Sequence, residues 1–312
     1  MQKVLVIKHG ALGDFVLETG AMFDIRRRHP QAQLHLLTAS AFVKMAKMMD
    51  IFDDILVDNR DSHLPLGILR GIAANGYDVI YDLQCSNRTR KRYFTILRWL
   101  CRGTYQWIDG RKKTCATITK RHALGCGSVK VEPIQLEWTP TDLSFMHSEN
   151  PELDKLPERY VLLICGCSPT HPYKRWPVPF FCELAQRLAA RGVAPVLIGT
   201  NAEAAEIGAV ADACHAAVSL LNKTALLDVP EIARRALATV GNDTGPSHMA
   251  AMSGGPTIAI YDNRPRNSAT RRDEKLAQPC KTYFENVERL LQPYESLSEH
   301  SKLEDSALKV NF

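Results

Sequence analysis

Short apolar runs alternate with amphipathic stretches through the first half of the chain. The run at 3–7, Lys-Val-Leu-Val-Ile, is typical of a parallel strand that is buried on both faces. An amphipathic stretch from about Phe15 to Arg28 follows, and Pro30 ends it, which predicts a helix. The same alternation predicts further strands and helices, in the order 34–37, 41–49, 54–57, 66–74 and 79–83. Strands separated by helices in this way predict a mostly parallel, doubly wound α/β sheet.

A polar stretch with two prolines, 150–157, separates this half from a second one in which the alternation restarts. Its predicted strands are 160–164, 194–198, 237–240 and 257–261, and its predicted helices are 177–190, 202–211 (capped by Asn201), 229–236 and 246–252. We therefore predict α/β domains at 1–150 and 151–282, a helix at 283–297 that packs across them, and a mobile tail at 298–312. Two such halves place a ligand between them, at the carboxyl ends of the strands.

Composition excludes several classes of protein. The 312 residues are 45% apolar and 23% charged, which is ordinary globular usage and excludes a disordered or collagen-like chain. No apolar run reaches the roughly 18 residues of a membrane span, and the N-terminal run is too short for a secretory signal, so a cytoplasmic protein is expected. The nine cysteines are scattered, with one close pair at Cys165 and Cys167, and we interpret them as reduced thiols and expect no metal site.

Positive charge is concentrated in one segment. Eleven Lys or Arg residues lie from Arg88 to Arg121, against one acid, Asp109, so this segment carries +10 while the whole chain carries +5. Tyr93 and Leu97 belong to an apolar face at helical spacing within it. The pattern fits an interfacial helix on anionic lipid, a nucleic-acid site, or a core-packed helix with a solvated basic side. An anionic partner follows from the first two interpretations.

The loop after the first strand runs from Gly10 to Asp14. It lacks the GxGxxG pattern of dinucleotide-binding proteins, which argues against a hydride-transfer enzyme. Two interpretations of Asp14 stay open. It caps the next helix, or its carboxylate faces the cleft at the carboxyl edge of the sheet, and one geometry allows both.

Two loops of the second half carry further candidate chemistry. The segment from Gly241 to His248 joins a strand to a helix start, where free N–H groups suit a phosphate or diphosphate; the alternative is a well-capped turn with nothing bound. The segment from Ser168 to Pro177 offers Lys174 as a cation for a leaving diphosphate. The alternative there is a solvated Lys-Arg pair.

Four motifs in this order resemble those of glycosyltransferase family 9, the ADP-heptose:lipopolysaccharide heptosyltransferases. They are Leu12-Gly13-Asp14 with Thr19 and Pro30-x-Ala32; Tyr77-Asp78-x-x-x-Asp82-Leu83-Gln84; Ser168 with Lys174-Arg175-Trp176-Pro177; and Gly241-Asn-Asp243-Thr244-Gly245-Pro246-x-His248-x-Ala250-Ala251. The resemblance runs from the first strand to about Tyr261. It implies a GT-B fold, in which two Rossmann-like domains face each other across a cleft and the second holds a nucleotide-sugar donor.

The resemblance also implies an activity and a set of roles. The expected reaction is metal-independent, inverting transfer of a sugar, heptose from ADP-heptose, to a lipid-linked anionic acceptor of the lipopolysaccharide inner core, at the inner face of the cytoplasmic membrane, with no cofactor and no nucleic-acid partner. Asp14 matches the general base. The expected donor contacts are Ser168, Lys174, Glu203, Asp243, Thr244, Gly245 and His248, and the expected acceptor contacts are Gly13, Arg88, Arg90 and Arg92.

The chain also departs from the family pattern. Gly20 stands where members usually carry proline, Cys165-Gly-Cys167 replaces Pro-Gly-Ala, and Tyr261-Asp-Asn-Arg264 replaces a Phe-Gly turn. These departures leave the transferred sugar less defined than the reaction class. Two alternatives remain: a nucleotide-sugar epimerase-like enzyme of the same fold, and a non-catalytic paralogue that binds lipopolysaccharide or another anion.

Overall fold

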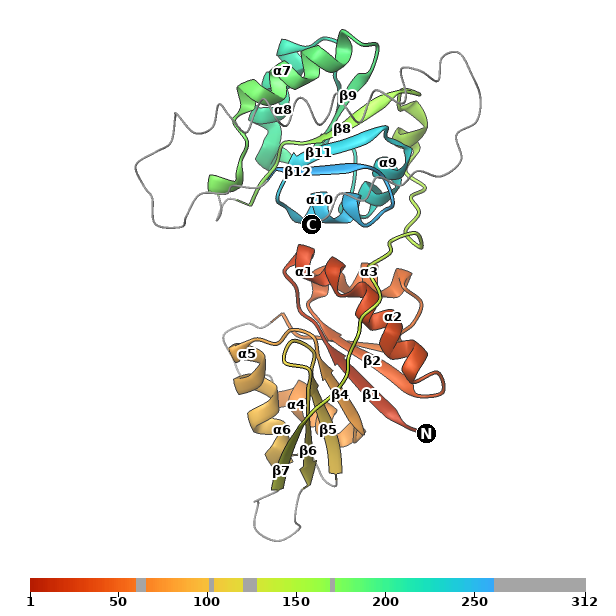
Figure 1. Cartoon of the computed structure of the whole chain (residues 1–312), viewed down its shortest axis with the longest axis vertical. Coiled ribbons are helices and arrows are strands. Elements are labelled where there is room, and N and C mark those ends of the chain that lie inside the picture. The colour runs from red at the N-terminus through yellow and green to blue at the C-terminus, as the bar shows by residue number, and fades with distance from the viewer. Residues whose placement is uncertain (60–65, 101–103, 120–127, 169–171, 261–312) are drawn as a thin grey trace. The chain divides into compact units, whose positions relative to one another are not determined.

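The computed structural model describes residues 1–59, 66–100, 104–119, 128–168 and 172–260, and the chain forms two compact units (Figure 1). Unit 1 holds Met1–Ser148 with Met252–Gly254, and unit 2 holds Glu149–Ala251 with 255–260 of the described residues. The predicted helix at 283–297 and the tail at 298–312 lie outside the described residues. Within the described ranges, no helix is long and apolar enough to cross a bilayer.

Unit 1 is built on a seven-stranded sheet with the order β3-β2-β1-β4-β5-β6-β7. The strands are β1 (Lys3–Ile7), β2 (Gln33–Thr38), β3 (Asp54–Val57), β4 (Val79–Asp82), β5 (Thr104–Asp109), β6 (Thr114–Thr119) and β7 (Ser128–Pro133). The first five are parallel, and β6 is antiparallel to both of its neighbours, β5 and β7. β5, β6 and β7 were not predicted from the sequence. They alternate apolar residues with Thr, Gln and Lys because they lie toward the edge, where the continuous apolar run of a buried strand is absent.

Helices cover both faces of this sheet (Figure 1). They are α1 (Leu12–Leu17), α2 (Thr19–Arg28), α3 (Val43–Met48), α4 (Leu66–Asn75), α5 (Asn87–Thr89) and α6 (Thr95–Leu100), with a π-helical turn at Arg90–Phe94. The helix predicted from Phe15 begins earlier and is interrupted at Glu18, which caps both α1 and α2. Leu5 and Ile7 of β1 pack in one core cluster with residues of α4 and α6, so the intervening Val4 and Val6 point to the opposite face.

Unit 2 is a fully parallel five-stranded sheet with the order β10-β9-β8-β11-β12. Its strands are β8 (Tyr160–Ile164), β9 (Ala194–Gly199), β10 (Val218–Leu221), β11 (Ala238–Asn242) and β12 (Thr257–Ile260). Its helices are α7 (Val178–Ala189), α8 (Ala204–Ala213), α9 (Val229–Arg235) and α10 (Gly245–Ala251). The short β10 was not predicted. Asn201 is not the cap of α8, because Thr200 caps a short 3₁₀ turn, Asn201–Glu203, that precedes that helix.

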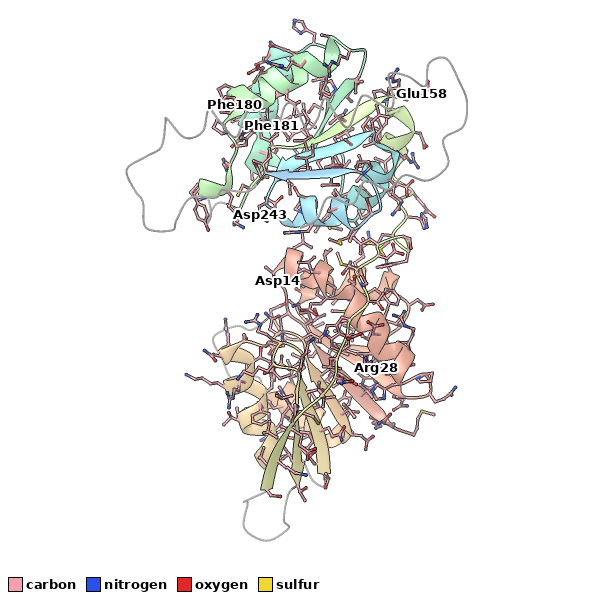
Figure 2. The ribbon with its side chains drawn as sticks, in the orientation of Figure 1. Asp14, Arg28, Glu158, Phe180, Phe181 and Asp243 are labelled. Carbon is pink, nitrogen blue, oxygen red and sulfur yellow. The ribbon has the colours of Figure 1, made fainter. Side chains whose placement is uncertain are left out.

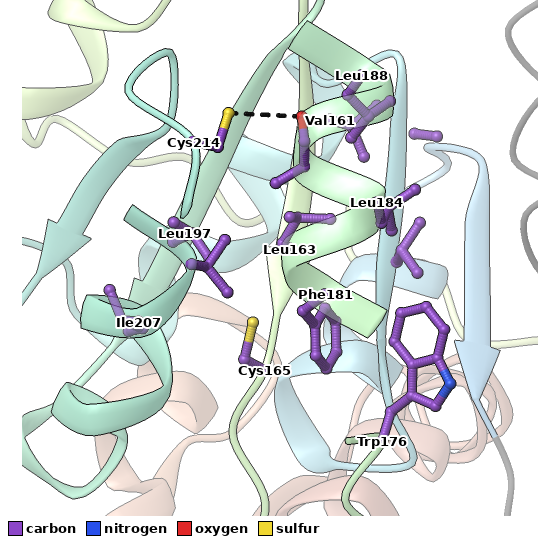
Figure 3. Close-up of a cluster of buried hydrophobic side chains, with 14 of the residues drawn as sticks. Val161, Leu163, Cys165, Trp176, Phe181, Leu184, Leu188, Leu197, Ile207 and Cys214 are labelled. Carbon is purple, nitrogen blue, oxygen red and sulfur yellow. Dashed lines mark hydrogen bonds between the residues drawn. The ribbon is translucent and has the colours of Figure 1, made fainter. Parts of the chain in front are cut away.

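The core of unit 2 fixes the start of α7 against the sheet (Figure 3). The apolar residues of α7 recur at helical spacing, and Phe181 and Leu184 pack against Val161 and Leu163 of β8. Trp176, just before the helix, is 5% exposed, and its ring meets Phe181 edge-on with centroids 4.8 Å apart. Each such buried side chain stabilises the unit by about 1.5–3 kcal/mol. The segment that leads into α7 is therefore anchored in the core.

Candidate functional site

Three of the predicted donor-side residues meet in unit 2. Asp243 directly follows β11, and its Oδ2 accepts a hydrogen bond from Lys174 Nζ at 2.5 Å. Its other oxygen, Oδ1, lies 3.3 Å from His248 Nε2. The bond to Asp243 raises the pKa of Lys174, so the ammonium stays charged. Both members of the ion pair remain partly exposed, at 31% and 20%, so a ligand can reach them.

The topology of the sheet brings these residues together. Lys174 ends a short 3₁₀ turn, Pro172–Lys174, between β8 and α7, and Asp243 lies after β11, the neighbour of β8. The carboxyl ends of parallel strands share one edge, where α/β proteins bind ligands. Thr244 and Gly245 continue this edge into α10: the Thr244 carbonyl accepts from His248 N at 3.0 Å, and its hydroxyl lies 3.3 Å from that of Ser247.

Asn242 connects three segments at this edge through hydrogen bonds of its side chain. This role was not predicted from the sequence. The Asn242 side chain is fully buried. Oδ1 accepts from the backbone N–H of Trp176 at 2.9 Å, and Nδ2 donates to the carbonyls of Cys165 at 2.8 Å and Gly166 at 3.1 Å. The available signal was an amide side chain at the end of an otherwise apolar strand, immediately before Asp243.

Glu203 and Ser168 lie at the same edge but outside the Lys174 cluster. Glu203 Oε2 accepts from Thr200 N at 2.9 Å and from Thr200 Oγ1 at 2.8 Å, so it completes a capping box. Its side chain also packs over Gly166, where an added Cβ would lie 2.8 Å from Glu203 Cγ. Ser168 is exposed and ends a described range, since 169–171 lie outside it.

Asp14 is an exposed residue in the first turn of α1 in unit 1 (Figure 2). The helix begins at Leu12 with Ala11 as its N-cap, so the interpretation of Asp14 as the cap is wrong. Gly13 precedes it and is half-buried. A carboxylate in the first turn of a helix is favoured by the helix dipole and stays open to solvent and to ligand.

Two charged residues near Asp14, Lys8 and Glu18, were not predicted from the sequence. Lys8 follows β1, is 4% exposed, donates from Nζ to the Leu83 carbonyl at 3.2 Å, and lies 3.7 Å from Glu18 Oε1. Burial lowers the pKa of Lys8, and burial raises the pKa of Glu18. Glu18 caps the end of α1 four residues after Asp14, and the charge of Asp14 contributes to the raised pKa of Glu18. A lysine after a buried strand and two acids at this spacing were the available signals.

The predicted acceptor arginines divide into two kinds. Arg92 binds the carboxylate of Asp58 through Nε and Nη2, both at 3.2 Å, and this pair is almost fully buried. The hydroxyl of Tyr93 donates to the same carboxylate. Arg88 and Arg90 are exposed. Arg92 is therefore held inside unit 1, whereas the other two arginines lie on its surface.

The apolar face of the basic segment lies in the core of unit 1. Tyr93 and Leu97 are fully buried and pack in the cluster of β1, β4 and α4. Of the interpretations left open above, the structure favours a core-packed helix with a solvated basic side. Among the residues described, no three His, Cys, Asp or Glu side chains gather as a metal site. Metal independence stays a prediction.

Sequence comparisons match the chain to a family and to a curated relative. The sequence model of glycosyltransferase family 9 (heptosyltransferase) matches residues 133–290, half of the chain. A curated relative, lipooligosaccharide heptosyltransferase 2 of Haemophilus influenzae, is 31% identical over 111 residues, which are 34% of this chain and 32% of that protein. The match thus spans about a third of the length of this relative.

Structure comparisons extend over nearly the whole chain. The E. coli heptosyltransferase WaaC with ADP has a TM-score of 0.64 at 20% identity, covering 93% of this chain and 99% of the other. E. coli ADP-heptose lps heptosyltransferase II has a TM-score of 0.64 at 16% identity, covering 94% and 100%. At these identities the likeness shows the fold. The predicted α/β GT-B architecture with two Rossmann-like domains is confirmed.

Proposed function

Since the chain belongs to glycosyltransferase family 9, we propose that it transfers a sugar, heptose from ADP-heptose, to an anionic acceptor of the lipopolysaccharide inner core. The observation that carries this proposal is the cluster of Lys174, Asp243 and His248 at the carboxyl edge of unit 2. A cation at this edge suits a diphosphate, which carries the negative charge of the leaving group. One solved relative of similar fold is described with ADP.

Unit 2 would hold the donor. The Lys174 ammonium is partly exposed and is charged, because its bond to Asp243 raises its pKa. As the bond between the anomeric carbon and the diphosphate breaks, the electron pair leaves with ADP, and Lys174 stabilises that growing charge. Thr244, Gly245 and His248 line the same turn, and Glu203 and Ser168 lie close by at this edge for contacts with the nucleotide.

Unit 1 would supply the base. Asp14 is exposed in the first turn of α1, which is what a residue that takes a proton from an incoming substrate requires. The acceptor hydroxyl loses its proton to this carboxylate as its oxygen forms the new bond to the anomeric carbon, with inversion there. General-base assistance of this kind contributes about 10²–10⁴-fold to the rate. The reaction needs no metal in this scheme.

The acceptor would bind at unit 1 as well. Arg88 in α5 and Arg90 at the start of the π-helical turn are exposed, and they would supply charge for a phosphorylated or acidic saccharide. Gly13 directly precedes Asp14 and is half-buried, and we assign it to the same acceptor site. Arg92 is held by Asp58 and would support the π-helical turn rather than touch the acceptor. We place the enzyme on the cytoplasmic side, peripherally at the inner membrane, because its acceptor is lipid-linked.

The test is release of ADP by the purified chain from ADP-heptose, with and without lipopolysaccharide from a heptose-deficient strain. The proposal predicts ADP release that requires the acceptor, together with a heptosyl gain in the mass of the acceptor. An epimerase would convert the donor without any acceptor. A non-catalytic paralogue would bind ADP-heptose or lipopolysaccharide with no turnover, and either result would contradict the proposal.

A further inference from the structure

The ion pair of the donor cluster joins two segments, and a single buried amide connects both of them. Lys174 lies in the turn before α7, and Asp243 lies after β11. Asn242 is covalently next to Asp243, and it accepts a hydrogen bond from the backbone of Trp176, two residues after Lys174. We propose that Asn242 is a positioning residue that fixes Lys174 and Asp243 relative to each other for binding a nucleoside diphosphate. This inference rests on the proposed function.

The hydrogen bonds of Asn242 engage the oxygen and both N–H donors of its amide, and they fit one orientation of that amide. Oδ1 faces a backbone N–H, and the two Nδ2 hydrogens face the carbonyls of Cys165 and Gly166. Rotating the amide by half a turn would set Oδ1 against two carbonyls and Nδ2 against an N–H. Because the side chain is fully buried, water cannot replace any of these bonds. The Asn242 side chain therefore holds three segments in fixed relative positions: the end of β8, the turn before α7 and the end of β11.

The ion pair alone cannot supply this rigidity. Lys174 reaches Asp243 through a long flexible side chain, and both ends of the pair are partly exposed. Without the amide, the two charges could still pair while the backbone of the Lys174 turn shifts. Binding and reactivity depend on where the ammonium sits, since a displacement of about 1 Å can cost about 10²-fold. The turn is held at Trp176 in two ways, because the Trp176 ring packs in the core and Asn242 binds its backbone N–H. The bond to Asn242 is the one that ties the turn to the strand end that carries Asp243.

The variants follow from this geometry. Asn242→Asp keeps the acceptor for Trp176 N but presents carboxylate oxygens to the carbonyls of Cys165 and Gly166. Asn242→Ala removes all three bonds without adding charge and serves if the aspartate variant fails to fold. Thr239→Val is the matched control. Thr239 is fully buried in the same strand, and its hydroxyl has no hydrogen-bond partner within the described part of the chain.

The measurement is the affinity for ADP, by calorimetry, alongside the KM for the acceptor. We expect Asn242→Asp and Asn242→Ala to weaken ADP binding about tenfold or more, with the acceptor KM unchanged, while Thr239→Val leaves both unchanged. In a Lys174→Met background the Asn242→Ala effect should shrink to less than about twofold, because the amide acts through the lysine. A purely structural role would lower the amount of folded protein and leave the ADP affinity of the folded fraction intact.

Failure of this inference and failure of the proposed function give different results. A folded Asn242 variant that binds ADP as tightly as the wild type overturns the inference, whatever the enzyme transfers. An Asn242→Ala effect that is equally large with Met at position 174 also overturns it. A wild-type chain that binds ADP but transfers no heptose contradicts the proposed function alone.

Discussion

Gly20 packs directly against the backbone of Thr139 and Pro140, which we call the crossing segment. A side chain at Gly20 would collide with this segment, which gives a testable prediction. A Cβ at Gly20 in α2 would lie 2.2 Å from the carbonyl oxygen of Thr139 and 3.0 Å from the backbone of Pro140. Ordinary contacts begin at about 3.4 Å, so the crossing segment would have to move by more than about 1 Å. A proline ring would meet the same carbonyl. This accounts for a glycine where the resembling family usually carries proline.

The segment that would have to move is held by hydrogen bonds. Thr139 donates from Oγ1 to Asp24 at 2.8 Å and from its backbone N–H to the same carboxylate, and Thr141 donates to the Leu17 carbonyl at 2.7 Å. Breaking a hydrogen bond to a charged group costs about 1.5–3 kcal/mol, and overpacking costs about 1–3 kcal/mol. Against this stands a gain of about 0.5–1 kcal/mol from replacing glycine in a helix. Gly20→Ala should therefore destabilise unit 1 by about 2–4 kcal/mol.

Gly71 provides the matched control, because it also lies in a helix of unit 1. Among the described residues, nothing lies within 4 Å of a Cβ built at Gly71 in α4, so alanine there should stabilise unit 1 by about 0.5–1 kcal/mol. The assay is urea unfolding followed by circular dichroism, with both variants compared in the same transition. A Gly20→Ala protein as stable as the wild type would refute the contact with Thr139.

Three further predictions concern charged groups. Burial raises the pKa of Asp82 from 3.8 to about 7. This carboxyl is therefore harder to ionise in the folded state than in the unfolded one, which lowers the free energy of unfolding by an amount that grows between these two pH values to about 4 kcal/mol. Asp82→Asn should therefore gain stability relative to the wild type as pH rises from about 4 to about 7 in chemical unfolding, and a difference that stays constant over this range would contradict this. Lys174→Met should weaken ADP binding by about 10–100-fold in calorimetry, since it removes the cation of the donor cluster, and unchanged affinity would contradict that role. Lys8→Met should lower kcat at least about tenfold with ADP affinity intact, since Lys8 lies in the electrostatic environment of Asp14 and Glu18; equal losses in both readouts would contradict it.

The sequence predicted the parts of the site that depend on local order along the chain. Strand, loop and helix follow one another at β8 and β11, and parallel strands share a carboxyl edge, so the motifs with Lys174 and Asp243 had to meet there. Their direct ion pair was not predicted. It depends on the order of strands in the sheet, which places β11 beside β8.

Contacts across long stretches of chain were beyond the sequence analysis. The pairing of Arg92 with Asp58 spans 34 residues, and nothing local distinguishes this arginine from its exposed neighbours. Helical periodicity showed that Tyr93 and Leu97 share one apolar face, but periodicity does not say what covers that face. The structure places it in the core of unit 1.

The central claim is that Asp14 acts as the general base, while the separate cluster of Lys174, Asp243 and His248 binds the nucleotide. Asp14→Asn tests it most directly, with heptosyl transfer and ADP affinity measured on the same preparation. The account predicts that transfer falls by about 10²–10⁴-fold while ADP affinity stays within about twofold of the wild type. Wild-type turnover by the asparagine enzyme would contradict the account.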